Sequence, residues 1–347
     1  MRIAQVAPLY ESVPPALYGG SERVVSWLTE ELVALGHDVT LFASGDSRTS
    51  AKLFPACAKA LWRDISIRET LPHHVLLAEQ VLRRSSDFDI VHFHCDYVHL
   101  PLVHLLSAPA ITTMHGLIHA PDHLNLFHAF PKARLVAISE RQKQPIPEAS
   151  WCGTVPHGMP PELHSFVATP EEYLLFLGRI SPDKGIERAI EIAKRSKRRL
   201  KIAAKIYEED RAYFTQTIKP LLDGLQIDFL GEVGGQLKND LIGKACGLLF
   251  PIEWQEPFGL VLIEALACGT PVVAWNRGSI PEIIEHGVHG YVVDSIDDAV
   301  DAVNNLSRIN RTCCRSHFNQ CFTTQKMAQR YLKIYQQEID RKKSAQR

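Results

Sequence analysis

Short apolar runs alternate with longer helical patterns along the whole chain. The runs are apolar at nearly every position, which is typical of parallel strands that helices cover on both faces. In the first half they are Ile3–Ala7, Val39–Ala43, Ile90–His94, Ala110–Met114 and Leu135–Ile138. In the second half they are Tyr173–Leu177, Leu200–Ala204, Ile227–Leu230, Gly247–Phe250, Val272–Ala274 and Tyr291–Val293. The amphipathic stretches between them, which predict right-handed βαβ units, include Glu22–Leu35, Ile186–Ser196, Gly259–Ala267 and Asp297–Leu306.

This pattern runs twice, and prolines mark the join. Five prolines lie within residues 144–161, and a fresh strand pattern starts at Tyr173. We therefore expect two doubly wound, parallel-sheet domains, one over residues 1–167 and one over residues 168–323. A last helical pattern lies within residues 324–347.

Composition and charge narrow the class of protein. The chain has 347 residues, of which 46% are hydrophobic, so it can bury a large core. Lys and Arg number 38 and Asp and Glu number 39, and this balance gives no basic surplus for binding nucleic acid.

The cysteines and the apolar runs bear on the compartment. The eight cysteines contain no C-x-x-C pair, which favours reduced thiols in a cytosolic protein. No apolar run reaches the 18 residues of a membrane span, and the first run, broken by Pro8, reads as a strand and not as a signal peptide. We expect a cytoplasmic protein, with docking on the inner face of a membrane left open.

Two loops that follow predicted strands could hold an anion. Gly19 and Gly20 stand just before a helical pattern, where backbone amides can approach an anion and the helix dipole favours it. A purely structural turn is the competing interpretation. In the second half, the loop after Tyr173–Leu177 places Arg179 and Lys184 beyond a strand end, as a planar fork and a point charge that suit phosphate.

A third segment carries two carboxylates around a predicted helix start. Glu256 precedes Pro257, so it is biased towards an extended conformation outside the helix. Pro257 suits a first helical turn, where Phe258 and Gly259 present free amides. Glu264 lies inside the same helix. A sugar could bond to Glu256 and a ribose to Glu264, since a carboxylate accepts two vicinal hydroxyls well.

At this point the sequence resembles a family. The segments "EPFGLVLIEALACGTPVVA", "LGRISPDKG", "GSIPEIIEHGVHGYVV", "YGGSERVV", "TMHG", "VAISE" and "VPHGM" are similar to those of the retaining nucleotide-sugar glycosyltransferases of family 4. The resemblance implies the GT-B fold, in which two Rossmann-like domains face each other across a cleft. It implies that the N-terminal domain binds the acceptor, that the C-terminal domain binds the donor, and that the helix in 324–347 crosses back to the N-terminal domain.

The resemblance also assigns roles to residues. Arg179 and Lys184 would hold the donor diphosphate, Glu264 the ribose and Glu256 the transferred sugar. The expected catalytic residues are His115, Glu256, Arg179 and Lys184. The expected donor-binding residues are Gly19, Gly20, Arg179, Lys184, Glu232, Val233, Glu256, Phe258, Gly259, Leu260, Val261 and Glu264. Among these, the backbone of Glu232 and Val233 would read the nucleobase. No cofactor and no divalent metal is expected.

Two other functions compete with this one. His92, His94 and Asp96 follow the H-x-H-x-D pattern of some metal-dependent hydrolases, because two histidines on one strand face can share an ion. His119, His123 and His128 are read as solvated or acceptor-side histidines. A catalytically silent module that binds sugar nucleotides is the second alternative.

The expected function is therefore transfer of a hexose, with retention, from a nucleotide-diphosphate sugar to an acceptor hydroxyl. The frequency of donors in the family favours UDP-glucose. The acceptor candidates are a lipid-linked saccharide, a growing surface polysaccharide and a small metabolite, and the first two would place the protein in polysaccharide or glycolipid synthesis.

Overall fold

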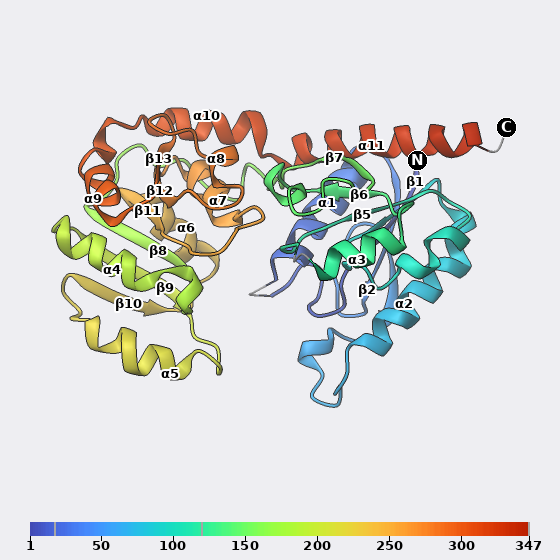
Figure 1. Cartoon of the computed structure of the whole chain (residues 1–347), viewed down its shortest axis with the longest axis horizontal. Coiled ribbons are helices and arrows are strands. Elements are labelled where there is room, and N and C mark those ends of the chain that lie inside the picture. Colours follow the sequence, from blue (N-terminus) through green and yellow to red (C-terminus); the bar gives the residue numbers. More distant parts are fainter. Residues whose placement is uncertain (17–18, 119–120, 346–347) are drawn as a thin grey trace. The chain divides into compact units, whose positions relative to one another are not determined.

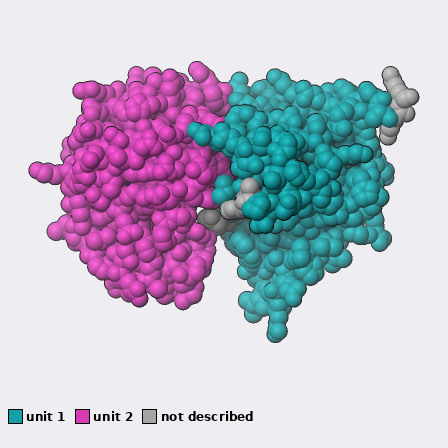
Figure 2. Space-filling view, viewed as in Figure 1, with its two compact units in different colours: residues 1–160, 323–347 teal, residues 161–322 magenta. Residues whose placement is uncertain are grey.

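The computed structural model of the chain describes residues 1–16, 19–118 and 121–345. The chain divides into two compact units (Figure 2). Unit 1 is made of Met1–Pro160 and Thr323–Arg347, and unit 2 of Pro161–Phe322. Tyr18 of the "YGGSERVV" segment and His119 lie outside the described residues.

Unit 1 contains a seven-stranded sheet in the order β3-β2-β1-β4-β5-β6-β7, with every neighbouring pair parallel. Its strands are β1 (Arg2–Val6), β2 (Asp38–Ser44), β3 (Lys52–Cys57), β4 (Ile90–Phe93), β5 (Ala110–Thr113), β6 (Leu135–Ala137) and β7 (Trp151–Thr154). Its helices are α1 (Gly20–Ala34), α2 (Leu71–Arg84), α3 (Asp122–Ala129) and α11 (Thr324–Ala345), which flank the sheet in Figure 1. The strand order reverses between β1 and β4, which is where such sheets bind ligands.

The last helix, α11, belongs to unit 1 and packs beside α1 and β4. Its buried side chains recur at helical spacing, so one face lies on the sheet. They are Thr324, Met327, Ala328, Tyr331, Ile334, Tyr335, Glu338 and Ile339. The chain enters α11 beside the segment that follows β7, because the Thr324 amide donates to the Met159 carbonyl at 3.1 Å.

Unit 2 contains a six-stranded parallel sheet in the order β10-β9-β8-β11-β12-β13. Its strands are β8 (Tyr173–Arg179), β9 (Arg199–Lys205), β10 (Ile227–Gly231), β11 (Gly247–Phe250), β12 (Val272–Trp275) and β13 (Gly290–Val293). Its helices are α4 (Ile186–Arg195), α5 (Arg211–Tyr213), α6 (Gly235–Lys244), α7 (Leu260–Cys268), α8 (Ile280–Ile283), α9 (Ile296–Asn304) and α10 (Arg311–Cys321). Here the strand order reverses between β8 and β11.

The expected fold class, two Rossmann-like doubly wound domains, is confirmed by these two sheets. The strands with continuous apolar runs were all expected, whereas the edge strands β3 and β7 were not. Every residue of β3 and β7 is at least partly accessible, so neither strand shows a continuous buried pattern. Among the described residues, no helix is both long and apolar enough to cross a bilayer.

The division of the chain differs from the expected one at 167 and 168. The structure divides it after Pro160, because α10 holds the following segment on unit 2. Arg315 donates to the carbonyls of Pro161 and His164 at 2.9 and 2.8 Å, and Arg311 donates to the Val167 carbonyl at 2.7 Å. These bonds satisfy backbone carbonyls that lie outside the strands and helices.

A buried ion pair on α11 supplies a test of how this helix is held. Glu338 is 3% exposed, and Arg134 donates to both of its carboxylate oxygens at 2.7 to 3.1 Å. Burial raises the pKa of Glu338, but the hydrogen bonds from Arg134 and Arg341 outweigh it and leave the pKa below its ordinary value.

We predict that Glu338→Gln lowers the free energy of unfolding by about 1–3 kcal/mol at neutral pH, because hydrogen bonds to a charged group are lost. Since the pKa of Glu338 is lowered on folding, its contribution is present above the unfolded-state pKa and is lost as the pH falls through the folded-state pKa. Urea unfolding at neutral pH and at about pH 3 should show the difference between wild type and variant shrinking in acid. Asp340→Asn, an exposed change on the same helix, is the control and should have little effect at either pH.

Candidate active site

In unit 2 most of the candidate residues lie near the point where the strand order reverses, whereas Glu232 and Val233 follow the edge strand β10. β8 ends at Arg179, and the loop after it runs through a turn at Pro182–Lys184 into α4. This loop lies against the segment that follows β11, since the Glu253 amide donates to the Asp183 carbonyl at 2.9 Å. The loops after β8 and β11 therefore flank the switch point, as expected for a ligand site in an open parallel sheet.

Gly185 allows this close approach. Its φ is 70°, and a Cβ placed there would lie 1.9 Å from the Pro251 carbonyl oxygen. Any other residue would push the two loops apart, besides adopting a left-handed backbone conformation. The glycine thus sets the distance between the Lys184 loop and the segment that carries Glu256.

Lys184 and Glu256 form an ion pair between these two loops. Their Nζ and Oε2 atoms are 3.4 Å apart, and the side chains are only 19% and 11% exposed. Lys184 Nζ also lies 4.4 Å from the centre of the Trp254 ring, which adds a cation–π contact. Burial raises the pKa of Glu256 by more than Lys184 and the Phe258 amide lower it. The carboxylate is therefore costly to keep charged unless cations and amides stay beside it.

The backbone at Glu256 is fixed by the turn that precedes α8. The Ser279 amide donates to the Glu256 carbonyl at 2.9 Å, and the Ser279 hydroxyl donates to the Phe258 carbonyl at 2.9 Å. A Cβ at Gly278 would lie 2.2 Å from the Glu256 carbonyl oxygen. Close backbone packing therefore holds the carboxylate in place.

The start of α7 lies directly after this carboxylate. Gly259 has a φ of 85° and precedes Leu260, and among the described residues no side chain caps the helix. The first-turn amides of α7, including those of Leu260 and Val261, carry the partial positive charge of the helix N-terminus. The Phe258 amide contributes a hydrogen bond to Glu256. The Phe258 amide and the Glu256 carboxylate, both expected to bind the sugar donor, are thus hydrogen-bonded to each other.

Glu264 lies further along α7 and is 5% exposed. Its Oε1 accepts from Lys238 Nζ of α6 at 2.6 Å. Sequence reasoning missed Lys238, because nothing in a polar helix shows which of its lysines meets a residue on another helix. Lys238 therefore joins the candidate site as the partner of the expected ribose ligand.

Arg179, Glu232 and Val233 complete the unit 2 set. Arg179 binds within its own loop, donating to Ser181 Oγ at 3.1 Å and pairing with Asp183 at 3.5 Å. Arg179 and Lys184 lie in the same loop, but Arg179 pairs with Asp183 and Lys184 pairs with Glu256. Glu232 follows β10 and lies 4.0 Å from Lys205 Nζ, and Val233 beside it is partly buried.

In unit 1 the expected glycines open α1. Gly19 has a φ of 137°, and a Cβ there would lie 2.8 Å from Pro15 Cβ and 3.2 Å from Glu22 Oε2. Sequence reasoning did not single out Glu22. Its side chain is 5% exposed, and burial raises its pKa to about 7. A carboxyl group that titrates near neutrality beside a glycine turn is a feature of functional sites.

His115 follows β5, which pairs with β4 at the switch point of the unit 1 sheet. Its Nε2 is 2.8 Å from His94 Nδ1, and its ring stacks on that of His157 with centres 5.2 Å apart. Burial lowers the pKa of His115 to about 4, so the ring is neutral at pH 7. A neutral imidazole offers one donor and one acceptor.

The H-x-H strand of the alternative hydrolase is a hydrogen-bonded core strand. His92 bonds to Tyr335 and Thr113, each at 2.7 Å, and His94 bonds to Gln5 and His115 at 2.7 and 2.8 Å. All four ring nitrogens of these two histidines thus have protein partners. In the ranges that the structure describes, no three His, Cys, Asp or Glu side chains are placed to hold a metal ion together.

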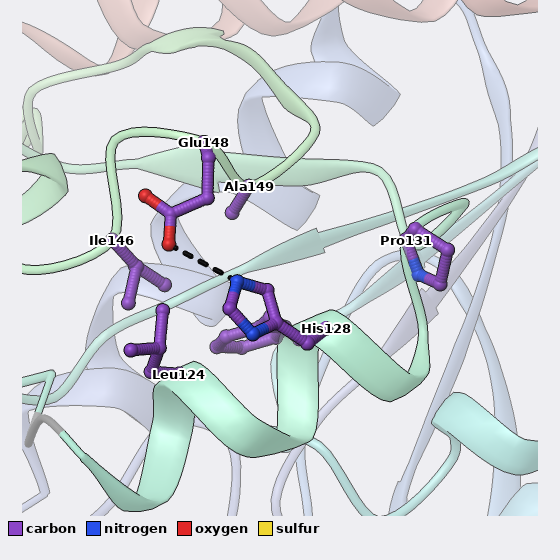
Figure 3. A pocket seen from close by; sticks show the side chains of 7 residues that line it. Leu124, His128, Pro131, Ile146, Glu148 and Ala149 are labelled. Carbon is purple, nitrogen blue, oxygen red and sulfur yellow. Dashed lines mark hydrogen bonds and ion pairs between the residues drawn. The ribbon is translucent and has the colours of Figure 1, made fainter.

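A separate pocket of about 170 Å³ lies in unit 1 between α3 and the segment before β7 (Figure 3). His128 Nε2 and Glu148 Oε1 lie within hydrogen-bond distance across it, 3.2 Å apart, and its other walls are mainly apolar. Its lining residues are Leu124, Phe127, His128, Pro131, Ile146, Glu148 and Ala149. None of the expected site residues is among them.

Both halves of the chain match models of known protein families. Residues 18–146 match the model described as Glycosyltransferase Family 4, and residues 164–315 match the model described as Glycosyl transferases group 1. An uncharacterized glycosyltransferase of Methanocaldococcus jannaschii is 28% identical over 87% of this chain and 89% of that protein. N-acetyl-alpha-D-glucosaminyl L-malate synthase of Bacillus anthracis is 23% identical over 91% of this chain and 93% of that protein.

A solved structure shows the same likeness. The glycosyltransferase AviGT4, which is involved in avilamycin A biosynthesis, is 25% identical in sequence and superposes with a TM-score of 0.74. The match covers 98% of each chain. Both sheets of this chain therefore have counterparts in that fold.

The packing of Gly185 can be tested with a matched glycine. Gly287 has a similar φ of 80°, but apart from its two chain neighbours no described residue has an atom within 4 Å of the place that a Cβ would take, so Gly287→Ala carries only the backbone cost of about 1–2 kcal/mol. Gly185→Ala has the same backbone cost and must also displace the Pro251 carbonyl. We predict that it lowers the free energy of unfolding by about 1–3 kcal/mol more than Gly287→Ala does, as measured by urea unfolding. Equal losses in the two variants would show that the loop contact is not tight.

Proposed function

Because the chain belongs to the GT-B glycosyltransferases of the family 4 type, we propose that it moves a hexose from a nucleotide-diphosphate sugar to an acceptor hydroxyl with retention. UDP-glucose is the proposed donor, on the frequency of donors in the family alone. The observation that carries the proposal is the Lys184–Glu256 pair at the uncapped start of α7. Cations and helix amides at one strand switch point form a site suited to a diphosphate.

Charge on the leaving group is the main chemical demand of this reaction. As the bond from the sugar to the diphosphate breaks, negative charge builds on the departing phosphate. Lys184, Arg179 and the first-turn amides of α7 would stabilise that charge from fixed positions, without reorganisation at the moment of reaction. The acceptor attacks on the face that the phosphate leaves, and the phosphate takes the acceptor proton, so no protein nucleophile is assigned.

The carboxylates hold the two ends of the donor in this proposal. Glu264 accepts from the ribose hydroxyls, and Lys238 lies beside it as its ion-pair partner. Glu256 accepts from hydroxyls of the transferred sugar, and the backbone at Glu232 and Val233 reads the nucleobase. In unit 1, His115 acts on a hydroxyl of the sugar, and the Gly19–Gly20 turn approaches the sugar or its phosphate. Because Lys184 and Arg179 supply the positive potential, we propose that no divalent ion takes part.

The proposed reaction is tested by nucleotide-diphosphate release from a panel of donors that includes UDP-glucose, with and without EDTA. We expect release from at least one donor, at the same rate after exhaustive chelation. Loss of release on adding EDTA, restored by zinc or manganese, would support the hydrolase alternative, since a bound ion would then generate the attacking water. Tight donor binding without any release would support the silent sugar-nucleotide module.

Substitutions of Glu264 and Glu256 are predicted to have different effects on nucleotide affinity. Glu264→Gln should weaken binding of the nucleotide diphosphate alone by about 10- to 100-fold, because a charged acceptor of the ribose is lost. Glu256→Gln should leave that affinity unchanged or raise it, because Lys184 loses its partner, while sugar transfer falls. Calorimetric titration with the nucleotide and a transfer assay measure the two effects. Glu191→Gln, an exposed change on α4, is the control, and the reverse order of the affinities would exchange the two assignments.

We also propose that unit 1 contacts an anionic membrane surface through the segment before and within α2. Five apolar side chains there are each at least 50% exposed. Arg63, which pairs with Glu11, and Arg68 lie among them, together with Asp64 and Glu69. The five are Trp62, Ile65, Leu71, Val75 and Leu76. The segment lies at the lower edge of unit 1 in Figure 1. Apolar side chains that enter the interface next to cations are the usual basis of such binding.

Vesicle sedimentation tests this contact. We predict binding to phosphatidylglycerol vesicles that weakens about tenfold or more in Ile65→Ser, because the transfer of one large apolar side chain is lost. Leu225→Ser is the matched control, since Leu225 is an exposed leucine of unit 2. Equal binding by wild type and Ile65→Ser would argue against the surface.

A further inference from the structure

A ladder of buried polar side chains runs across the unit 1 sheet to His115. Gln5 on β1 faces His92 on β4 in the strand register, and His94 follows two residues later on the same face. Tyr331 and Tyr335 reach this face from α11. Gln5, His92, His94, Thr113, Tyr331 and Tyr335 are all at most 1% exposed. Water therefore does not complete their hydrogen bonds, and each group must use the others.

The direction of the hydrogen bonds can be worked out from Gln5. Its amide Nε2 donates to Tyr335 Oη at 2.9 Å, and its Oε1 lies 2.7 Å from His94 Nε2. An amide oxygen can only accept, so His94 Nε2 carries the proton of that bond. Burial and neighbouring histidines lower the pKa of His94 well below its ordinary value, so the ring is neutral and its Nδ1 is bare.

The proton position on His94 in turn sets the proton position on His115. His94 Nδ1 is 2.8 Å from His115 Nε2, and since a bare Nδ1 accepts, His115 Nε2 must donate. A neutral His115 with its proton on Nε2 has no proton on Nδ1. That Nδ1 is buried and, within residues 1–16, 19–118 and 121–345, has no hydrogen-bond partner. The stacked ring of His157 limits rotation of His115.

We propose that Gln5 and His94 are positioning residues that fix the tautomer of His115, so that His115 presents a bare Nδ1 as the acceptor for a substrate hydroxyl. This inference rests on the proposed function, because the hydroxyl is one of the sugar or of the acceptor. With a bare Nδ1, His115 can orient a hydroxyl by accepting its hydrogen bond. The same atom cannot donate a hydrogen bond to a phosphate or carbonyl oxygen. If the Gln5 amide were turned over, every hydrogen bond of the ladder would reverse and His115 would carry its proton on Nδ1. Nδ1 of His115 would then be a donor instead of an acceptor.

The tautomer can be read directly. Long-range ¹H–¹⁵N correlation spectra of the full chain labelled with ¹⁵N-histidine distinguish protonated from bare ring nitrogens, and comparison with His115→Ala assigns the signals of His115. We expect Nε2 of His115 to be protonated and Nδ1 to be bare in the wild-type protein. A protonated Nδ1 would overturn the proposal. This measurement uses the wild-type protein and does not depend on whether a Gln5 variant folds.

Two variants then test the cause. Gln5→Leu removes the fixed acceptor, so we expect His115 to lose its single tautomer and kcat/KM to fall about tenfold or more, with nucleotide affinity unchanged. Thr112→Val is the control. It removes a buried hydrogen bond of 2.8 Å between Thr112 and His99, and Thr112, which precedes Thr113 on β5, faces the opposite side of the sheet. This variant should keep the tautomer and the turnover. A single bare-Nδ1 tautomer with wild-type turnover in Gln5→Leu would overturn the role of Gln5.

The outcomes for this inference and for the proposed function are separate. Absence of nucleotide-diphosphate release from every donor would remove the proposed function while the spectra still decide the tautomer. Release by the wild type together with a protonated Nδ1 would keep the proposed function and remove the inference.

Discussion

The burial of Glu256 beside Lys184 is the interaction on which the unit 2 site depends. Burial raises the pKa of this carboxyl, so its charged form needs the ammonium group and the Phe258 amide close by. Lys184 comes from the loop after β8, which approaches the Glu256 segment closely because Gly185 has no side chain, and Gly278 lets the turn before α8 pack on the backbone of Glu256. The site is thus held by electrostatics and by backbone packing together. A phosphate group placed there would meet a cation that is already held and already partly desolvated.

The two units use the same topology with opposite chemistry. In each, candidate residues lie near the strands where the sheet order reverses, β8 and β11 in unit 2 and β1 and β4 in unit 1, although His115 follows the neighbouring β5 and Glu232 and Val233 follow the edge strand β10. Unit 2 places full charges there, at Lys184, Glu256 and, on α7, Glu264. Unit 1 instead buries neutral imidazoles and an amide, whose hydrogen bonds are made without a net charge. The first arrangement suits a charged phosphate group, and the second suits hydroxyl groups that need an orienting acceptor.

The sequence predicted the parallel sheets because their central strands are buried on both faces and show as unbroken apolar runs. It missed the edge strands β3 and β7, which are partly accessible along their whole length. The glutamates and cations of unit 2 could be found because they stand in short segments next to strand ends. Lys238 and Gln5 could not, since each meets its partner from another element and neither stands in a recognisable local pattern. Their importance depends on contacts that only the folded chain makes.

The last helix shows why such contacts matter for His115. The buried face of α11 carries two tyrosines, and a buried hydroxyl is costly unless it is hydrogen-bonded. Tyr335 accepts from Gln5 and, in the order set by the Gln5 amide, donates to His92 Nδ1. His92 then donates to Thr113, whose hydroxyl pairs with Tyr331. Phenylalanines at these two positions would cover the same apolar surface and leave Gln5 and His92 short of partners. The hydroxyls of α11 therefore do more than fill space, because they complete the hydrogen bonds of Gln5, His92 and Thr113.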